Sequence, residues 1–258
     1  MDEDGQKLLH QKGGSVLRHM KKAFTLFAMF FILLLAGCAQ VAQKQGTDKN
    51  VSGKIVDDSG GGDLARLENF EKVTFRTEDG FVIAANFTRA GKNAVVLLPQ
   101  RGMDRGSYSN FAKKLVDANF TTLALDLRGH GESLEKDVAA GKKYLQQQGF
   151  EIYAIVGASI GANTAVNYAG QNPSVKKIVL LSPGLNYLGI DAEKPARDVK
   201  AKALIVASEE DSYSFGSAKA LARLIPGAEF MGLQRAGHGT NMFNGTLLEN
   251  DVVKWLSK

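Results

Sequence analysis

From about residue 70 onwards, short apolar runs rich in β-branched residues alternate with stretches of helical periodicity. The clearest runs are AVVLLP (94–99), IYAIVG (152–157) and AKALIVAS (201–208). Continuous apolar runs are typical of strands that are buried on both faces of a parallel sheet. Between them, segments 107–119 and 160–169 carry apolar or small residues at helical spacing. The alternation predicts an α/β fold, with a mostly parallel sheet covered by helices on both faces.

The remaining segments extend the same order. Asp79-Gly80 lies between two alternating runs and predicts an antiparallel hairpin that opens the sheet. Residues 183–200 form a connection too short for a sizeable lid, so we expect an eight-stranded sheet with minimal or no cap. The further predicted strands are 121–127, 176–183 and 228–233, and the further predicted helices are 138–148, 217–225 and 247–256.

The N-terminal segment indicates export. From Met20, two lysines precede an apolar run over 23–36, which is typical of a secretory signal and short for a bilayer-spanning helix. The following Leu35-Ala36-Gly37-Cys38 resembles the lipobox of bacterial lipoproteins, which implies that Cys38 becomes the lipidated mature N-terminus. Cys38 is the only cysteine, so it forms no intramolecular disulfide. The alternative is an uncleaved membrane anchor in which Cys38 is incidental.

These features divide the chain into three parts. Residues 1–37 are upstream residues and signal peptide, residues 38–63 are the lipidated cysteine and a polar, flexible tether, and residues 64–258 are the globular domain. Ala39 stands where an aspartate would resemble the inner-membrane retention signal of Gram-negative lipoproteins. The resemblance therefore implies a lipid-anchored envelope protein, at the outer membrane if the source is Gram-negative.

Ser159 is the candidate nucleophile. It lies in IVGASIGAN, between Gly157 and Gly161, where a predicted buried strand is followed by a helix of small residues. A G-x-S-x-G segment in this context is typical of a nucleophile elbow, a sharp turn that exposes the serine at the sheet edge. The N–H of Ile160, at the start of the helix, is a candidate oxyanion donor.

A serine hydroxyl needs a base to take its proton, and that base needs a partner to orient it. After residue 37 the histidines are His130, which follows strand 121–127, and His238, which follows the last predicted strand. The acidic residues 209–211 directly follow strand 201–208. The ends of parallel strands meet at one sheet edge, so these groups are expected near Ser159.

With these residues, positions 70–258 resemble the α/β-hydrolase superfamily, whose catalytic residues occur in the order Ser, Asp, His. The resemblance implies that Asp211 is the acid and His238 the base, with Glu210 as the alternative acid. DLRGHGES, at 126–133, resembles the family's D-x-R-G-x-G-x-S turn, which implies a structural His130.

The segment after strand 94–99 departs from the family. Many members have His-Gly where this chain has Pro99 and Gln100. The resemblance implies that the backbone N–H of Arg101 is the second oxyanion donor, with the register open by one residue. Because the donor is a backbone group, the change of side chains need not abolish it.

The combined interpretation is a serine hydrolase that cleaves a carboxylic ester, or a related acyl bond, of a small molecule through an acyl-enzyme. Thioester, amide and peptide cleavage stay open, since the same triad serves all of them. No cofactor or metal is expected, and no basic stripe with interleaved aromatic residues suggests nucleic acid. The alternative is a non-catalytic, lipid-anchored binding or envelope protein with this fold.

Residues 182–200 leave one local alternative open. Leu185, Tyr187 and Leu188 either line the substrate pocket or belong to a loop that packs on the surface, and we expect the loop. Acyl preference and oligomeric state have no visible signal in the sequence.

Overall fold

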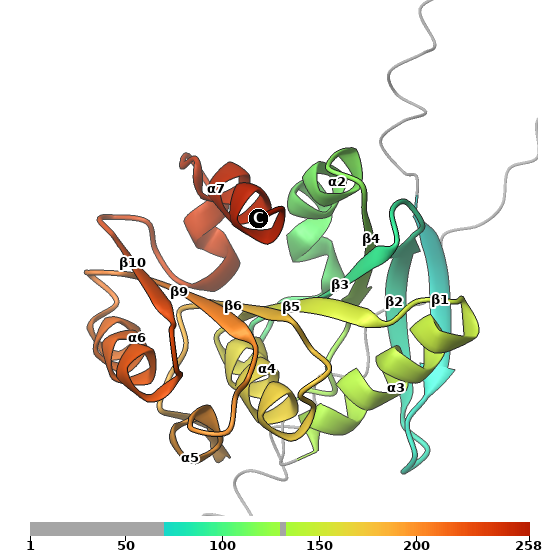
Figure 1. The fold of residues 1–258 in the computed structure, drawn as a ribbon, viewed down its shortest axis with the longest axis horizontal. Coiled ribbons are helices and arrows are strands. Elements are labelled where there is room, and N and C mark those ends of the chain that lie inside the picture. The colour runs from blue at the N-terminus through green and yellow to red at the C-terminus, as the bar shows by residue number, and fades with distance from the viewer. Residues whose placement is uncertain (1–69, 130–132) are drawn as a thin grey trace, which may run out of the picture. The chain divides into compact units, whose positions relative to one another are not determined.

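The computed structural model describes residues 70–129 and 133–258. Its eight-stranded sheet has the order β1-β2-β4-β3-β5-β6-β9-β10 (Figure 1). The predicted domain boundaries after residues 37 and 63 lie outside the described residues. The strands are β1 Glu71–Arg76, β2 Val82–Thr88, β3 Asn93–Leu98, β4 Phe120–Leu125, β5 Ile152–Ala158, β6 Lys177–Leu181, β9 Lys202–Ser208 and β10 Glu229–Leu233.

The sheet is mostly parallel, as predicted. β2 pairs antiparallel with β1 and with β4, whereas all pairs from β4 to β10 are parallel. The turn between β1 and β2 contains Gly80 at φ +84°, the left-handed conformation that glycine adopts without strain. The six parallel strands therefore end at one edge of the sheet, and the turns that follow β3, β5, β6, β9 and β10 are neighbours there.

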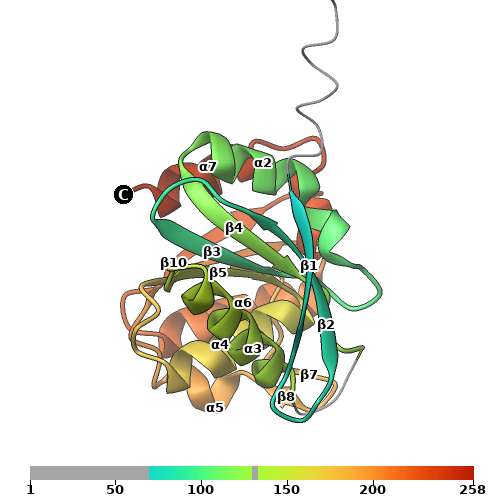
Figure 2. The same ribbon diagram turned by 90° about the vertical axis from the view of Figure 1, so that its right-hand side faces the viewer.

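Helices cover both faces of the sheet (Figure 2). One face carries α2 and α7, and the other carries α3, α4 and α6 with the short α5 (Figure 1). This layering confirms the predicted α/β class. The helices are η1 Arg105–Tyr108, α2 Ser109–Asp117, α3 Leu134–Gln147, α4 Ile160–Gln171, α5 Glu193–Ala196, α6 Ser212–Leu224, η2 Gly239–Phe243 and α7 Leu248–Leu256.

Two helices begin earlier than the periodicity predicted. α3 begins at Leu134 and α6 at Ser212, four and five residues before the predicted starts. The first turn of α6 contains serines and an aromatic residue, which are moderate helix formers and give no apolar period. Asp211 compensates as N-cap, because its side chain accepts a hydrogen bond from the N–H of Ser214.

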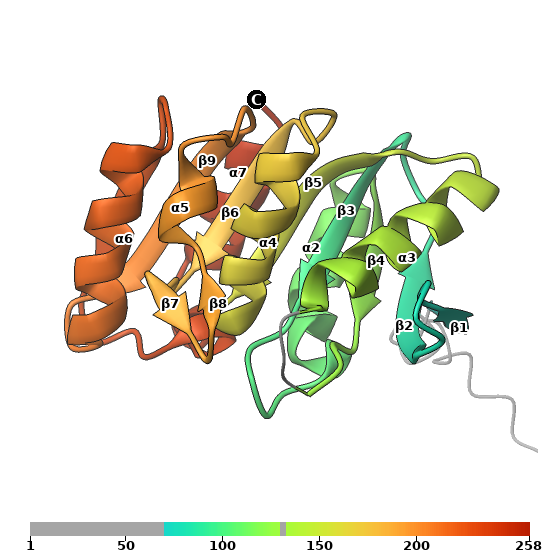
Figure 3. The same ribbon diagram turned by 90° about the horizontal axis from the view of Figure 1, so that it is seen from below.

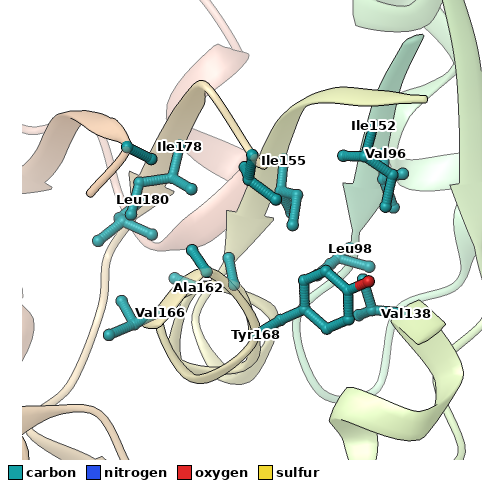
Figure 4. Packing of buried hydrophobic residues seen from close by; sticks show 14 of the residues in the cluster. Val96, Leu98, Val138, Ile152, Ile155, Ala162, Val166, Tyr168, Ile178 and Leu180 are labelled. Atoms are coloured by element: carbon teal, nitrogen blue, oxygen red, sulfur yellow. The ribbon is translucent and has the colours of Figure 1, made fainter. Parts of the chain in front are cut away.

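The central core packs α4 against β3, β5 and β6. Leu98, Ile155 and Leu180 point from the strands towards Ala162 and Val166 of the helix (Figure 4). All five side chains are fully buried. The small residues of α4 bring its axis close to the sheet, so the helix start that follows Ser159 is fixed by the core beneath it.

The segment between β6 and β9 is a fixed structure and not the plain loop that we expected. β7 (Asn186–Tyr187) and β8 (Ile190–Asp191) form a short hairpin beside α4 (Figure 3). Asn163 of α4 holds it, because its amide donates to the carbonyl of Ile190 at 2.8 Å and accepts from the N–H of Gly184 at 3.0 Å. This hairpin and α5 are the whole insertion, so the domain has no separate cap.

The D-x-R-G turn after β4 ties the opening hairpin to the sheet. Arg128 donates from Nε to Asp137 at 2.6 Å and from its terminal nitrogens to Asp79 of the hairpin turn. Its guanidinium also lies 4.9 Å from the ring centre of Phe81. The hydrogen bonds to Arg128 are the main cause that lowers the pKa of Asp79 well below its ordinary value. The turn therefore has a structural role; His130 itself lies outside the described residues.

Candidate active site

Ser159 lies at the sharp turn between β5 and α4, as the motif predicted. Its backbone has φ 53° and ψ −115°, a conformation that costs a non-glycine residue free energy and persists only where the surroundings enforce it. Its N–H donates to the carbonyl of Leu181 at 2.8 Å, and its side chain is buried. The strained turn holds the hydroxyl at the carboxyl edge of the sheet.

The two flanking glycines permit this turn. A Cβ on Gly157 would lie 2.2 Å from the carbonyl oxygen of Gly161. A Cβ on Gly161 would lie 2.4 Å from the carbonyl oxygen of Leu98, at the end of β3, and 2.7 Å from that of Pro99. No side chain fits at either position without moving backbone, so the G-x-S-x-G pattern here is a packing requirement.

Asp211 and His238 are in direct contact. Nδ1 of His238 lies 2.5 Å from Oδ2 of Asp211, and both side chains are partly buried. Asp211 follows β9 and caps α6, while His238 follows β10, so two different strand ends supply the pair. A carboxylate on Nδ1 fixes the tautomer that leaves Nε2 free to act as a base.

Glu210, the alternative acid, bonds to the histidine loop instead of the imidazole. Its carboxylate accepts from the hydroxyl of Ser208 at 2.6 Å and from the N–H groups of Gly237 and Arg235 at 2.7 and 2.9 Å. These hydrogen bonds, the one from Ser208 first, lower the pKa of Glu210 to about 2. Glu210 thus shapes the turn that carries His238.

The residues after His238 are held from the other side of the site. The N–H of Gly239 donates to Ser182 Oγ at 2.9 Å, and the N–H of Thr240 donates to Gln100 Oε1 at 2.7 Å. Gln100 therefore joins the end of β3 to the histidine loop. In the sequence, Gln100 stands out only as a departure from the family pattern, and no local pattern signals this role.

The two proposed oxyanion donors lie on neighbouring elements. Ile160 is the first residue of α4, where N–H groups have no acceptor within the helix. Arg101 lies in a turn in which the N–H of Met103 donates to the carbonyl of Gln100 at 3.1 Å. The helix η1 that follows is held by Asp126, which accepts from the N–H of Arg105 at 2.8 Å. The roles of Ile160 and Arg101 stay predictions.

Tyr187 lies in the site, which corrects the expectation of a plain surface loop. Its hydroxyl is 2.7 Å from Ser214 Oγ, and its ring lies edge to face with the imidazole of His238 at a centroid distance of 6.3 Å. Burial raises the pKa of Tyr187, and its hydroxyl also interacts weakly with the side chain of Ser159. Leu185 packs against the core, and Leu188 is exposed at the tip of the hairpin.

The geometry agrees with the family model that the chain matches. The family model described as serine aminopeptidase, S33, matches residues 89–207, which include the Ser159 elbow and end before Asp211 and His238. The sheet order, the elbow and this match together identify the fold. The chain has the α/β-hydrolase fold. No curated protein matches it significantly in sequence.

Solved structures show the same fold at low identity. An esterase domain from Rhodothermus marinus has 16% identity and a TM-score of 0.64, covering 73% of this chain and 98% of its own. A dienelactone hydrolase from Anabaena variabilis has 17% identity and a TM-score of 0.61, covering 73% and 96%. An esterase from Pyrococcus furiosus has 15% identity and a TM-score of 0.62, covering 83% and 98%. The chain thus shares the architecture of these two esterases and the dienelactone hydrolase.

The predicted lipid anchor falls outside the part of the chain that the structure describes. Cys38 lies outside the described residues, so its lipidation stays a prediction. Within residues 70–129 and 133–258, no group of three His, Cys, Asp or Glu side chains gathers closely enough to hold a metal ion. No helix in that part is long and apolar enough to cross a bilayer.

Glu210 gives the hydrolase a testable dependence on pH. Folding lowers the pKa of Glu210 to about 2. The carboxylate therefore stabilises the folded state at pH values above its ordinary pKa, and this contribution is lost as the pH falls towards 2. We expect Glu210→Gln to lower the free energy of unfolding at neutral pH, with a gap to the wild type that narrows by about pH 3.5. Urea denaturation of both proteins measures the gap, and a gap independent of pH would contradict the assignment.

Proposed function

We propose that this hydrolase is a lipid-anchored serine esterase in which Ser159 is the nucleophile, His238 the base and Asp211 the acid. The contact between His238 Nδ1 and Asp211 Oδ2 is the observation that carries the proposal. It joins two groups at the sheet edge where the strained turn holds Ser159. A serine hydrolase needs these three roles at one place, and three separate strand ends supply them.

The mechanism follows from the roles of the three groups. Nε2 of His238 takes the proton of Ser159 as its oxygen attacks the acyl carbonyl, and Asp211 stabilises the imidazolium that forms. Collapse of the tetrahedral intermediate releases the alcohol, which receives the proton from His238. Water then attacks the acyl-enzyme by the same sequence and regenerates Ser159.

Backbone N–H groups stabilise the oxyanion in this proposal. The N–H of Ile160 comes from the start of α4, where the helix dipole also favours negative charge. The N–H of Arg101 comes from the turn after β3, which lies against α4 through Gly161. Each such donor typically lowers the barrier by about 3 kcal/mol.

An ester is the substrate class that the structure supports best. The insertion between β6 and β9 is only a hairpin and one short helix, so no cap domain selects a large leaving group. Several structural neighbours are esterases by name. Because the matched family model is named for an aminopeptidase, amide cleavage is the second chemistry to assay.

The anchor is proposed from the sequence. Leu35-Ala36-Gly37-Cys38 follows a charged and then apolar segment, and Cys38 is the single cysteine. Several acyl chains on one residue anchor a protein firmly, whereas one chain binds marginally. We infer an exported enzyme on the cell envelope, at the outer membrane in a Gram-negative source.

A reactive-serine probe tests activity and anchor together in membranes from cells that express the full chain. A fluorophosphonate should label a membrane-bound band, and the same membranes should hydrolyse a short p-nitrophenyl ester. Ser159→Ala should abolish both signals because it removes the nucleophile. Cys38→Ser should keep the probe reaction but abolish incorporation of radiolabelled palmitate.

The outcomes separate the candidate functions. Labelling without ester turnover would keep the activated serine and exclude simple esters as substrates. A folded protein that the probe does not label would contradict catalysis and favour the non-catalytic binding protein. Palmitate incorporation by Cys38→Ser would contradict the anchor alone.

The identity of the acid is tested by two matched amides. Asp211→Asn should lower kcat by about 10⁴-fold, because an amide stabilises the wrong imidazole tautomer. Glu210→Gln should cause a much smaller loss, since Glu210 bonds to the loop and not to the imidazole. Steady-state kinetics on one ester compares them; the reverse order of losses would make Glu210 the acid.

A further inference from the structure

Tyr187 is the side chain near the triad that the proposed mechanism leaves unused. Its hydroxyl is 2.7 Å from Ser214 Oγ and interacts with the side chain of Ser159. Its ring packs edge to face against His238. Tyr187 thus packs against the proposed base and lies near the proposed nucleophile, although it belongs to a hairpin outside the eight-stranded sheet.

The surroundings hold Tyr187 in this position. The ring of Tyr213 packs against it at a centroid distance of 5.4 Å, and the Tyr213 hydroxyl donates to the carbonyl of Asn186 at 2.8 Å. A Cβ on Gly184 would lie 2.8 Å from Cε2 of Tyr187, so the backbone passes directly over the ring. Asn163 fixes the hairpin to α4. The hydroxyl is therefore a preorganised group.

The hydroxyl has a proton to donate. Burial raises the pKa of Tyr187 above its ordinary value, so the phenol is neutral throughout the neutral range. A phenol donates one hydrogen bond and accepts others. With Ser214 as donor in the 2.7 Å contact, the proton of Tyr187 is available for an oxygen bound at Ser159.

The position of Tyr187 relative to the triad determines which substrate oxygen its hydroxyl can contact. The proposed oxyanion donors come from the start of α4 and the turn after β3, whereas Tyr187 comes from the segment after β6 and packs on the imidazole. In a serine hydrolase the imidazole faces the leaving group, to which it gives its proton. The packing on the imidazole therefore favours a role for the Tyr187 hydroxyl on the leaving-group side of Ser159.

We propose that Tyr187 is a further catalytic residue that donates a hydrogen bond to the leaving-group oxygen, and that the enzyme therefore accepts esters of poorly acidic alcohols. The inference rests on the proposed serine esterase function. When the tetrahedral intermediate collapses, the bond from carbon to the leaving oxygen breaks and its electron pair stays on that oxygen. His238 Nε2 delivers the proton, and Tyr187 keeps its own proton while stabilising the negative charge.

This role depends on the leaving group. An alkoxide leaves with a large, localised negative charge on oxygen, so a fixed donor lowers its barrier strongly. A p-nitrophenolate is stable without help and gains little. If Tyr187 only lined the site, its removal would change kcat/KM for both kinds of ester by the same factor.

The test compares Tyr187→Phe with the wild type on acetate esters whose alcohols range from p-nitrophenol to ethanol. The full chain is used in detergent, and kcat/KM is plotted against the pKa of the alcohol. We expect Tyr187→Phe to lose about 10-fold to 100-fold on the alkyl esters, the size of one hydrogen bond to a charged oxygen, and little on the p-nitrophenyl ester. The plot for the variant should be steeper.

Two further variants define the cause. Tyr153→Phe removes a hydroxyl that donates to the carbonyl of Leu256, at the opposite end of β5 from Ser159, and should leave the slope unchanged. Ser214→Ala removes the partner that orients the Tyr187 hydroxyl, and should steepen the slope in the same direction as Tyr187→Phe.

An equal loss on all esters, or none, in a Tyr187→Phe protein that the fluorophosphonate still labels at Ser159 would overturn the inference and leave the esterase assignment intact. A wild-type protein that is neither labelled nor active would overturn the esterase assignment and this inference with it. Labelling of wild type and variant thus distinguishes the two failures.

Discussion

The contact between the first turn of α4 and the ends of β3 and β5 determines the rest of the site. Gly161 lies against the carbonyls of Leu98 and Pro99, and Gly157 lies against Gly161. This packing enforces the strained conformation of Ser159. It also brings the turn after β3 next to the helix start, so both candidate oxyanion donors come from one packing contact. The fully buried core under α4 stabilises the arrangement (Figure 4).

The proposed base, His238, is positioned by a second set of contacts at the same edge. His238 lies on an irregular turn, and a turn of this kind needs side chains to satisfy its N–H groups. Glu210, Ser182 and Gln100, each from the end of a different strand, accept from that turn. Because these three side chains hold the backbone of the turn, the contact of Asp211 with His238 only has to orient the imidazole. A parallel sheet makes this possible, because it places the ends of distant segments side by side.

Much of the fold follows from sequence because its signals are local. Continuous apolar runs marked the parallel strands, Asp79-Gly80 marked the hairpin, and Ser159, Asp211 and His238 each follow a strong strand signal. The roles of Gln100 and Tyr187 depend on contacts between residues far apart in the chain, such as Gln100 with Thr240. The hairpin that carries Tyr187 has strands of two residues, too short for a period-2 pattern.

The proposed mechanism requires that Ser159 carries the acyl group between two half-reactions. Rapid mixing of the full chain with p-nitrophenyl acetate, followed by acid quench and peptide mass mapping, tests it most directly. The account predicts a burst of p-nitrophenol near one equivalent of enzyme and an acetyl mass on the peptide that contains Ser159, both absent from Ser159→Ala. Turnover that persists in Ser159→Ala, or an acetyl group on another residue, would contradict the account.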